Sequence, residues 1–566
     1  MPVNNLTRRR LIKTVAIGTG SLAITGLASC TNTEPALAKA SFDHGVASGD
    51  PGVDRAVIWT RAESQDQVAA VEIEWQVATD SECQNIVGRG RETTDASRDY
   101  TLKLDVTGLN PGQRYYYRFV AADTSSVVGS FLTLPAGDVA EFSLAVVSCA
   151  NYPAGFFNVY RSVADRSDID AVVHLGDYIY EYGMGGYATS DAEAMGRVPS
   201  PVTEIQSLAD YRQRYAQYRS DSDLQHAHQR HAFICVWDDH EFANDSWRDG
   251  AENHQSGEGG WAQRKAAAIQ AYYEWMPVRE PIGGERANLY RRLQVGNLLD
   301  LYMLDTRIVG RDKPLEYSDY IDKETGAFDG ERFQSELTNP ARAMMGEEQF
   351  NWLKNEMQAS SSTWQVLGQQ TLIGRMVLPA PVVTRNVSFG DYAQMARIAQ
   401  EQPEALSAEQ QMVLQQPLIP YNLDAWDGYP VERERLLNAC VGGDKNLVVF
   451  AGDSHNGWAN NITTQDGVAV GVEFATSSVS SPGLEAYLDE VPDELAAGMV
   501  ELIDGLQYAQ TSHRGFMLVK FSAAEVQAQW HYVNTVADRE FHLLDDQQKL
   551  LSSRPGKTER KILFTE

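Results

Sequence analysis

Four short segments of the sequence combine thiol, carboxylate, phenol and imidazole side chains, the groups that hold metal ions or move protons. Each segment directly follows an apolar run that predicts a buried strand. The segments are Ser148-Cys149-Ala150-Asn151, Gly176-Asp177-Tyr178-Ile179-Tyr180-Glu181, Trp237-Asp238-Asp239-His240-Glu241 and Gly452-Asp453-Ser454-His455-Asn456. Taken singly, such residues usually have structural roles, because a cysteine packs as a small apolar side chain and Gly-Asp forms turns. Four of them in one region favour a shared site.

The residue types at these positions suit metal ions of two kinds. Asp177, Asp239 and Asp453 supply hard carboxylate oxygens, which Ca²⁺, Mg²⁺ and Mn²⁺ prefer. Cys149 and Tyr180 supply a thiolate and a phenolate, which are poor ligands for Ca²⁺ and good ones for Fe³⁺ or Zn²⁺. This mixed donor set predicts more than one kind of metal ion. Two adjacent cations could clamp a phosphate and lower the pKa of a bridging water.

The region that carries these segments, residues 136–566, has the pattern of a layered α/β domain. Near-continuous apolar runs predict strands buried on both faces, with helical stretches such as 261–275 between them. The runs cover residues 142–148, 171–175, 233–237, 298–304, 364–367 and 447–451. Because ligands collect at the carboxyl ends of the strands in such sheets, we expect the four segments to converge there.

Residues 41–135 have a different pattern, with apolar and polar residues in alternation. Val71, Ile73 and Trp75 alternate with glutamate and glutamine, and turn signals at residues 50–52 and 110–112 separate the runs. This pattern predicts an antiparallel β-sandwich with a structural role. The stretch 109–117 resembles fibronectin type III-like domains.

The first forty residues predict an export signal. Thr7-Arg8-Arg9-Arg10 precedes a weakly apolar run, residues 15–27, that is too short to cross a membrane. This arrangement resembles a twin-arginine leader, which implies passage through the twin-arginine export machinery and a periplasmic or extracellular location. Two cleavage points stay open. A lipobox ending at Cys30 would give a lipid anchor, and Ala36-Leu37-Ala38 resembles an ordinary signal-peptidase site.

Composition restricts the possible partners. The 566 residues carry a formal net charge of -29, which argues against a specific nucleic-acid partner because polyanion binding relies on clusters of lysine and arginine. An acidic surface does not attract phosphate esters either, so local cations such as bound metal ions must overcome its field. The five cysteines are too few for a disulfide scaffold at this length.

The motifs together resemble a known family. Gly176-Asp177-Tyr178-Ile179-Tyr180 is similar to the Gly-Asp-x-x-Tyr of purple acid phosphatases, in which Asp bridges two metals and Tyr binds Fe³⁺. The sequence departs from the wider metallophosphoesterase pattern at three points: Ser148-Cys149 replaces Asp-x-[Gly/His], Asp239 replaces Asn, and Asp453 replaces His. With Leu304-Asp305-Thr306-Arg307, these departures resemble the PhoD-type alkaline phosphatases.

This resemblance implies a fold, a cofactor set and residue roles. The implied fold is a layered αββα metallophosphoesterase-like catalytic domain preceded by an antiparallel, fibronectin III-like β-sandwich, and the implied cofactors are Ca²⁺ and Fe³⁺. Carried over by position, Cys149 and Tyr180 correspond to Fe³⁺ ligands and Asp177 to the bridging carboxylate. Asp239 and Asp453 would hold calcium-type ions. His455 takes the iron-binding position of the broader superfamily, with its metal left open.

Other polar residues of the motifs are assigned with alternatives. His240 is the candidate to protonate the leaving alkoxide or to hold the phosphate. Arg307 is placed for a bidentate phosphate contact or for a structural pair with Asp305. Asp238 is either a metal ligand or a carboxylate that orients His240. Four amides could be neutral ligands, phosphate donors or structural groups: Asn151, Asn244, Gln369 and Gln370.

The expected activity is hydrolysis of small phosphate esters. We expect an exported enzyme that releases inorganic phosphate from phosphomonoesters and also acts on phosphodiesters. One alternative is a phosphodiesterase or phospholipase D on the same scaffold, since the metal motifs do not distinguish the ester type. Another is a non-catalytic envelope protein that uses its β-domain for adhesion.

Overall fold

The computed structural model describes residues 39–65, 69–281, 286–325, 327–488 and 491–564, and these belong to one compact unit. The predicted leader, with its arginines and Cys30, lies outside the described residues except for positions 39 and 40. Ala40 already belongs to strand β1 (Ala40–Ser41), which pairs with β4 (Glu63–Ser64). None of the helices in the described ranges has the length and apolar character needed to cross a bilayer.

The N-terminal region is antiparallel, as its alternating pattern predicts. Five strands form a sheet in the order β10-β8-β5-β6, with β9 paired to β8. They are β5 (Ala70–Ala78), β6 (Ile86–Asp95), β8 (Arg114–Ala121), β9 (Thr124–Ser125) and β10 (Gly129–Leu132). Val71 and Ile73 are fully buried, and so are Tyr117 and Phe119 of the neighbouring strand β8. The alternation therefore places one side of each strand in a core of its own.

Three further N-terminal strands do not belong to this sheet and instead form one end of the ten-stranded sheet described below. They are β2 (Val46–Gly49), β3 (Arg55–Arg61) and β7 (Thr101–Thr107). Strand β2 pairs in parallel with β13 (Ala232–Cys235), so a strand from the N-terminal region hydrogen-bonds directly to a strand that positions the site. Strands β2 and β3 are buried almost throughout instead of alternating, and the sequence pattern contains no signal for the partner of β2.

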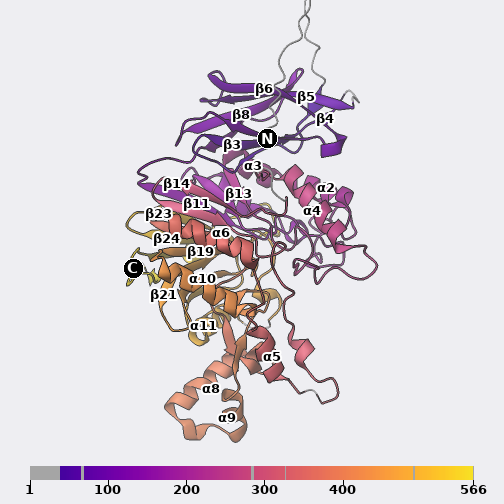
Figure 1. The fold of residues 1–566 in the computed structure, drawn as a ribbon. Helices are drawn as coiled ribbons and strands as arrows, with labels where there is room; N and C mark the ends of the chain where they lie inside the picture. Colours follow the sequence, from indigo (N-terminus) through magenta and orange to yellow (C-terminus); the bar gives the residue numbers. More distant parts are fainter. Residues whose placement is uncertain (1–38, 66–68, 282–285, 326, 489–490, 565–566) are drawn as a thin grey trace, which may run out of the picture. The chain divides into compact units, whose positions relative to one another are not determined.

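Two large sheets form the rest of the molecule (Figure 1). The first has ten strands in the order β26-β25-β24-β23-β11-β12-β13-β2-β3-β7, and the second has seven in the order β14-β15-β16-β19-β21-β20-β22. The first sheet adds β11 (Glu141–Val147), β12 (Ala171–His174), β23 (Arg514–Ser522), β24 (Val526–Val533), β25 (Lys549–Ser553) and β26 (Leu563–Phe564). The second contains β14 (Arg291–Val295), β15 (Leu299–Met303), β16 (Trp364–Gly368), β19 (Leu447–Ala451), β20 (Gly457–Thr463), β21 (Ala469–Ala475) and β22 (Leu506–Gln510). The parallel cores β11-β12-β13 and β15-β16-β19-β21 place their carboxyl ends together.

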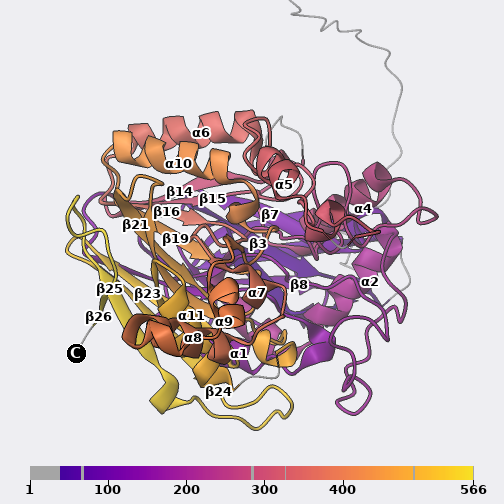
Figure 2. The same ribbon diagram turned by 90° about the horizontal axis from the view of Figure 1, so that it is seen from below.

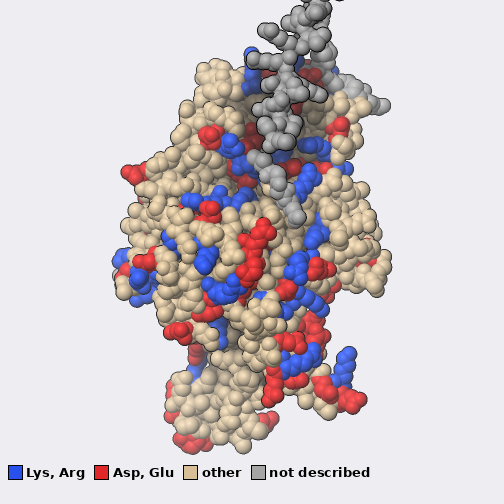
Figure 3. Space-filling model, viewed as in Figure 1, with Lys and Arg blue, Asp and Glu red and all other residues tan. Residues whose placement is uncertain are grey.

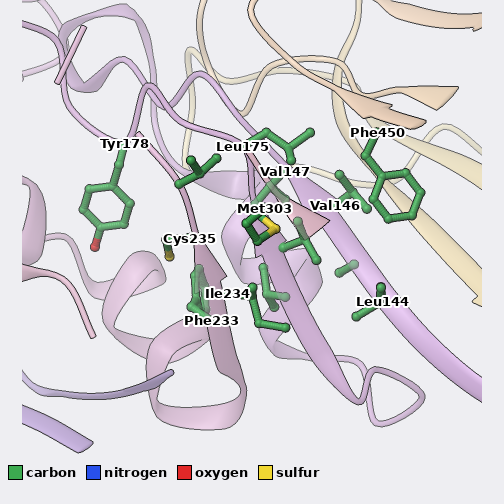
Figure 4. Packing of buried hydrophobic residues seen from close by; sticks show 14 of the residues in the cluster. Leu144, Val146, Val147, Leu175, Tyr178, Phe233, Ile234, Cys235, Met303 and Phe450 are labelled. Atoms are coloured by element: carbon green, nitrogen blue, oxygen red, sulfur yellow. The ribbon is translucent and has the colours of Figure 1, made fainter. Parts of the chain in front are cut away.

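The two sheets pack face to face and helices cover them outside. A single buried cluster joins Val146 of β11, Leu301 of β15 and Phe450 of β19, and Figure 4 shows Val146 and Phe450 beside one another. Helices α6 (Gly346–Ala359) and α10 (Pro430–Gly442) cover the seven-stranded sheet (Figure 2). On the side of the ten-stranded sheet lie α2 (Leu208–Arg219), α3 (Ser222–Arg230) and α4 (Trp261–Trp275), and α1 (Asn158–Ala164) contacts β23 and β24 of the same sheet. This arrangement confirms the predicted αββα layering.

A smaller lobe extends from the layered body at one end of the view in Figure 1. It is built on the hairpin of β17 (Val377–Pro379) and β18 (Leu418–Pro420). The helices of this end are α5 (Gly330–Leu337), α7 (Ala380–Val383), α8 (Phe389–Glu401), α9 (Ala408–Leu414) and α11 (Pro492–Leu502). Figure 3 shows that basic and acidic side chains are intermixed over the body on this face.

Candidate metal centre

The four segments expected to carry the chemistry meet where β11, β12, β13 and β19 end. The backbone N–H of Cys149 donates to the carbonyl of Gly176 (3.2 Å), which joins the ends of β11 and β12. The N–H of Val479 donates to the carbonyl of Ser148 (2.9 Å), which ties the end of β11 to a segment that follows β21 of the other sheet. The site therefore lies at the shared carboxyl edge of both sheets, as the strand pattern predicts.

Two glycines allow these strand ends to approach one another. Gly176 has φ of +106°, and a Cβ at this position would lie 2.4 Å from the Cβ of Asp238. A Cβ at Gly452 would lie 2.7 Å from Oγ of Ser148. Because neither distance is tolerated between real atoms, any side chain at these glycines would push neighbouring donor segments apart.

Several donor residues have left-handed backbone conformations. The φ angles are 59° at Cys149, 53° at Asp177, 56° at Asp453 and 62° at His455. Such a conformation costs a residue with a side chain about 1 kcal/mol or more, and it persists where the surrounding structure imposes it. Four of these residues at one site indicate that the strand ends turn sharply in order to aim their side chains inward.

One group of donors contains sulfur, and we call Cys149, Asp177, Tyr180 and His455 the sulfur pocket. Ligand atoms of Cys149, Asp177 and His455 all lie within 4.8 Å of one another. The hydroxyl of Tyr180 donates to Oδ2 of Asp177 (3.0 Å) and lies 3.2 Å from Nε2 of His455. These contacts place a thiol, a carboxylate, a phenol and an imidazole next to one another, close enough to bind one metal ion.

Hydrogen bonds set the orientation of His455. Its Nδ1 lies 2.8 Å from the carbonyl oxygen of Pro482 and 3.2 Å from the hydroxyl of Tyr187. A carbonyl only accepts, so Nδ1 carries the proton and Nε2 directs its lone pair into the pocket. Burial lowers the pKa of His455 to about 3, which keeps the ring neutral as a metal ligand requires.

A second group of donors is made of carboxylates, and we call Asp238, Asp239, Asp424 and Asp453 the acidic pocket. Ligand atoms of Asp238, Asp239 and Asp453 lie within 4.8 Å of one another. The fully buried guanidinium of Arg307 lies among them and donates to Asp238, to Asp424 (2.6 Å) and to Asp453 (2.7 Å).

The two pockets are joined through shared carboxylates. Asp177 of the sulfur pocket also groups with Asp239 and His240 within 4.8 Å, and Asp239 belongs to the acidic pocket. A continuous row of donors therefore leads from the Cys149 thiol to the Asp453 carboxylate.

His240 lies at this junction and is held by a carboxylate. Its Nδ1 lies 2.7 Å from Oε2 of Glu181, whose other oxygen accepts from the N–H of Asn244 and from the amide of Asn253, each at 2.8 Å. Glu181 thus fixes the proton on Nδ1 and leaves Nε2 to face the site. Burial disfavours the charged ring, but Asp239, Asp177 and Glu181 outweigh it and raise the pKa of His240 well above its usual range.

The donor set fits bound cations on two counts. Burial raises the pKa of Asp177, Asp238 and the Cys149 thiol well above their usual ranges, and a cation nearby would favour their ionised forms. Oδ2 of Asp238 and Oδ1 of Asp239 are buried with no hydrogen-bond partner among the described residues. Buried acceptors with spare lone pairs are where a metal ion is accommodated.

Comparisons with known proteins agree with this geometry. The PhoD-like phosphatase family model matches residues 144–530, and the model described as "PhoD-like phosphatase, N-terminal domain" matches residues 28–135. The chain belongs to the PhoD-like phosphatase family. It is 34% identical over 468 residues to alkaline phosphatase D of Bacillus subtilis (strain 168), covering 80% of this chain and 71% of that relative. A solved structure titled "Structure of PhoD" matches with a TM-score of 0.76 and 30% identity, covering 93% of this chain and 92% of that one.

Membership of the PhoD-like phosphatases confirms the resemblance identified from the strand-end motifs. The protein is a phosphoric ester hydrolase, and its substrates are phosphate esters. The family is metal-dependent, and the sulfur and acidic pockets are its candidate metal-binding groups in this chain.

In this PhoD-like phosphatase, Arg307 has carboxylate partners that the sequence did not indicate. Its guanidinium is committed to the carboxylates of the acidic pocket, so the predicted bidentate phosphate contact stays a prediction. Asp305 does not pair with that guanidinium. Its carboxylate instead accepts from the backbone N–H of Arg307 (2.8 Å) and from the indole N–H of Trp237 (2.7 Å).

The neutral amides differ in whether their side chains already have hydrogen-bond partners within the described residues. Both ends of the Gln370 side chain are used, since it accepts from Thr306 and donates to the Trp237 carbonyl (2.6 Å). The side-chain oxygen of Gln369 accepts from the indole of Trp426 (2.6 Å). Asn151 is buried with neither amide atom bonded within the described part of the chain, so it remains a candidate ligand.

Glu241 has a role that the motif alone does not reveal. One of its oxygens accepts from the backbone N–H of Asp177 (3.0 Å) and of Asp238 (2.7 Å), and the other accepts from the N–H of Tyr178 (2.5 Å). Its buried carboxylate therefore ties the loop after β12 to the loop after β13. This contact sets the spacing between a donor of the sulfur pocket and one of the acidic pocket.

Sequence reasoning missed several residues of the site. Asp424 lies in a loop that follows no predicted strand, and no local signal identifies it. Ser481 follows β21 and donates to the hydroxyl of Tyr180 (2.7 Å), but a serine in a serine-rich stretch is uninformative by itself. Glu181 and Glu241 stand inside the motifs quoted above, where their proximity to donor residues is the available signal.

Proposed function

We propose that this protein is an exported alkaline phosphatase that hydrolyses phosphomonoesters with a cluster of Ca²⁺ and Fe³⁺ and releases inorganic phosphate. The observation that supports this proposal is the row of donors of two kinds, in which Asp177 and Asp239 join a sulfur pocket to an acidic pocket. Phosphodiester hydrolysis is a secondary activity of the same site.

In this proposal, the donor chemistry of each pocket determines which cation it holds. Cys149, Tyr180 and His455 offer thiolate, phenolate and imidazole, which suit Fe³⁺, with Asp177 shared. Asp238, Asp239 and Asp453 offer the carboxylate oxygens that suit Ca²⁺. When bound, such cations neutralise phosphate charge and make a water molecule more acidic.

His240 supplies the proton that the leaving alcohol needs. With Nδ1 held by Glu181, a protonated His240 directs Nε2–H into the site and donates that proton to the departing alkoxide. Glu181, which is not one of the proposed metal ligands, favours the protonated form of this imidazole. Tyr180 stacks on the His240 ring with centroids 4.1 Å apart, which restricts the ring to this orientation.

Export follows from the leader sequence in this proposal. The arginines at positions 8–10 and the weakly apolar run after them direct the chain to the twin-arginine machinery, which carries folded proteins. Cleavage at Cys30 would leave a lipid-anchored enzyme, and cleavage after Ala38 a free one. Both place the phosphatase outside the cytoplasm.

Metal analysis together with two substrates tests the proposal. We expect the purified full-length protein to contain iron and calcium, and to hydrolyse 4-nitrophenyl phosphate faster than bis(4-nitrophenyl) phosphate. Full activity in protein that elemental analysis shows to be free of iron would contradict the mixed cluster. A faster reaction with the bis-ester would instead favour the phosphodiesterase alternative.

A further inference from the structure

A cavity of about 280 Å³ opens beside the acidic pocket, and we call it the side cavity. Asp245 and Asp424 line it, together with the aromatic residues Trp247, Tyr317 and Tyr421. Its volume is near the lower end of the roughly 300–1,000 Å³ typical of small-molecule sites, so it suits a single ring better than a long chain.

One wall of the side cavity is also a wall of the metal centre. Asp424 accepts from Nη1 of Arg307 (2.6 Å), and Nη2 of Arg307 donates to Asp453. The backbone N–H of Asp245 donates to Oδ2 of Asp239 (2.6 Å). A phosphate held at the acidic pocket would therefore have the side cavity next to it, with room for the group esterified to it.

Several charged groups of the cavity already have partners in the protein. Arg307 and Arg311 bind Asp424, and Lys313 pairs with Glu316 at 3.1 Å. The carboxylate of Glu252 accepts from the side chain of Asn244 (3.3 Å). Asp245 and Glu252 have no cationic partner among these pairs, and the four carboxylates and one lysine of the lining give the walls a negative formal charge that disfavours an anionic ligand.

The aromatic rings are the features of the cavity best suited to a ligand. Trp247 lines the cavity and is partly exposed, and Nζ of Lys313 lies over one face of its ring, 5.7 Å from the centroid. Tyr421 is also partly exposed. Flat rings of this kind bind aromatic and apolar groups by stacking.

We propose that the side cavity holds the alcohol half of the substrate and selects esters of uncharged aromatic alcohols over esters of anionic alcohols. Trp247 and Tyr421 are the specificity-determining residues. This inference rests on the proposed phosphomonoesterase function, because it assumes that a phosphate is bound at the neighbouring metal centre.

Steady-state kinetics of the metal-loaded, full-length protein test the side cavity with three esters: phenyl phosphate, glycerol 2-phosphate and 3-phosphoglycerate. We expect 3-phosphoglycerate to have the lowest kcat/KM. In Trp247→Leu and Tyr421→Leu, the ratio of kcat/KM for phenyl phosphate to that for glycerol 2-phosphate should fall about three- to tenfold, through KM. Comparing this ratio between variants cancels the different reactivity of the two leaving groups.

Two control variants separate stacking from general destabilisation. Trp247→Phe keeps a ring and should keep most of the preference for phenyl phosphate. Trp352→Leu removes a partly exposed tryptophan on α6 that packs against Tyr290, and it should leave the ratio unchanged. Thermal unfolding midpoints show whether each variant is folded.

The outcomes distinguish failure of the inference from failure of the function. An unchanged ratio in both leucine variants at positions 247 and 421, or an equal change in Trp352→Leu, would overturn the side cavity as the alcohol site. Efficient hydrolysis of 3-phosphoglycerate relative to phenyl phosphate would overturn it too. If the wild-type protein hydrolyses none of the three esters, the proposed phosphomonoesterase function itself is wrong.

Discussion

The sulfur pocket and the acidic pocket lie at the same sheet edge, but their charges are balanced differently. No arginine or lysine donates to the sulfur pocket, whose hydrogen-bond partners include phenols, the Ser481 hydroxyl and the Pro482 carbonyl, and the cationic group next to it is the titratable ring of His240 at the junction. The acidic pocket surrounds the guanidinium of Arg307, which provides a permanent cation. The donors of the sulfur pocket therefore depend more on a bound metal ion to stabilise their ionised forms. In the acidic pocket, Arg307 balances part of the negative charge even when no metal is bound.

This contrast teaches that one site can hold two metal environments because the protein sets the charge of each separately. The pockets differ in donor hardness and in built-in cations, yet Asp177 and Asp239 hold them in contact. Substitutions on each side and at the junction should therefore have separable effects.

The largest effect is expected at the junction. Asp177→Asn removes a carboxylate charge shared between the two groups of donors, and it should lower kcat/KM at least about 1000-fold while depleting metals of both kinds. Elemental analysis and kinetics on the same preparation measure this. Loss of a single metal with the other fully retained would show that Asp177 belongs to one pocket only.

Substitutions on either side should separate the two pockets. Cys149→Ala should lose iron and most activity and keep calcium, whereas Asp453→Asn should lose calcium first, because sulfur and carboxylate donors favour different ions. Cys440→Ala, at a buried thiol in α10, is a control for loss of a cysteine elsewhere. If Cys149→Ala retains its iron, the assignment of the sulfur pocket is wrong.

A substitution at His240 tests proton donation to the leaving group separately from metal binding. His240→Ala should lower kcat about 100-fold for an alkyl ester, whose alkoxide needs a proton, and should affect 4-nitrophenyl phosphate less. Metal content should persist. An equal loss for all leaving groups would argue against the proton-donor role.

A substitution at Glu241 tests whether its carboxylate sets the spacing between the two pockets. Glu241→Gln replaces one acceptor oxygen with an NH₂ group that faces backbone N–H donors, and activity or metal affinity should fall about 10- to 100-fold. Glu432→Gln is the matched control, because this buried carboxylate accepts from the N–H groups of Met344 and Met345 far along the chain. Similar losses in both variants would reduce Glu241 to a general stabilising role.

The smallest effect concerns stability outside both pockets. Burial lowers the pKa of His231 to about 4, so the folded protein keeps this ring neutral while the unfolded chain binds a proton below about 6.5. The free energy of unfolding should therefore fall as the pH drops from 6.5 towards 4, by about 2 kcal/mol from this residue at pH 5. Urea unfolding at pH 7 and pH 5 should show a smaller drop in His231→Gln than in the wild type. An identical drop would mean that His231 titrates normally.

The parts of the fold that the sequence predicts are those with local signals. The apolar runs that end at Ser148, Leu175 and Ala451 match strands β11, β12 and β19 to within about two residues, because strands buried on both faces need continuous apolar sequence. The partner of a strand leaves no such signal. The N-terminal strand β2 pairs with β13 across a long sequence separation, and all four residues of β2 are buried, so its sequence does not identify the partner.

The sequence by itself determined the chemistry of the donors, their positions at strand ends, and the family. Residue type fixes ligand hardness, and the end of an apolar run fixes where a sheet presents polar groups. Only the tertiary structure decided that Arg307 is surrounded by carboxylates, that Asp424 joins them, and that the side cavity lies next to them. The physical reason is that the contacts of Arg307 join residues 69 to 146 positions apart, and packing of the two sheets, rather than any local pattern, brings such loops together.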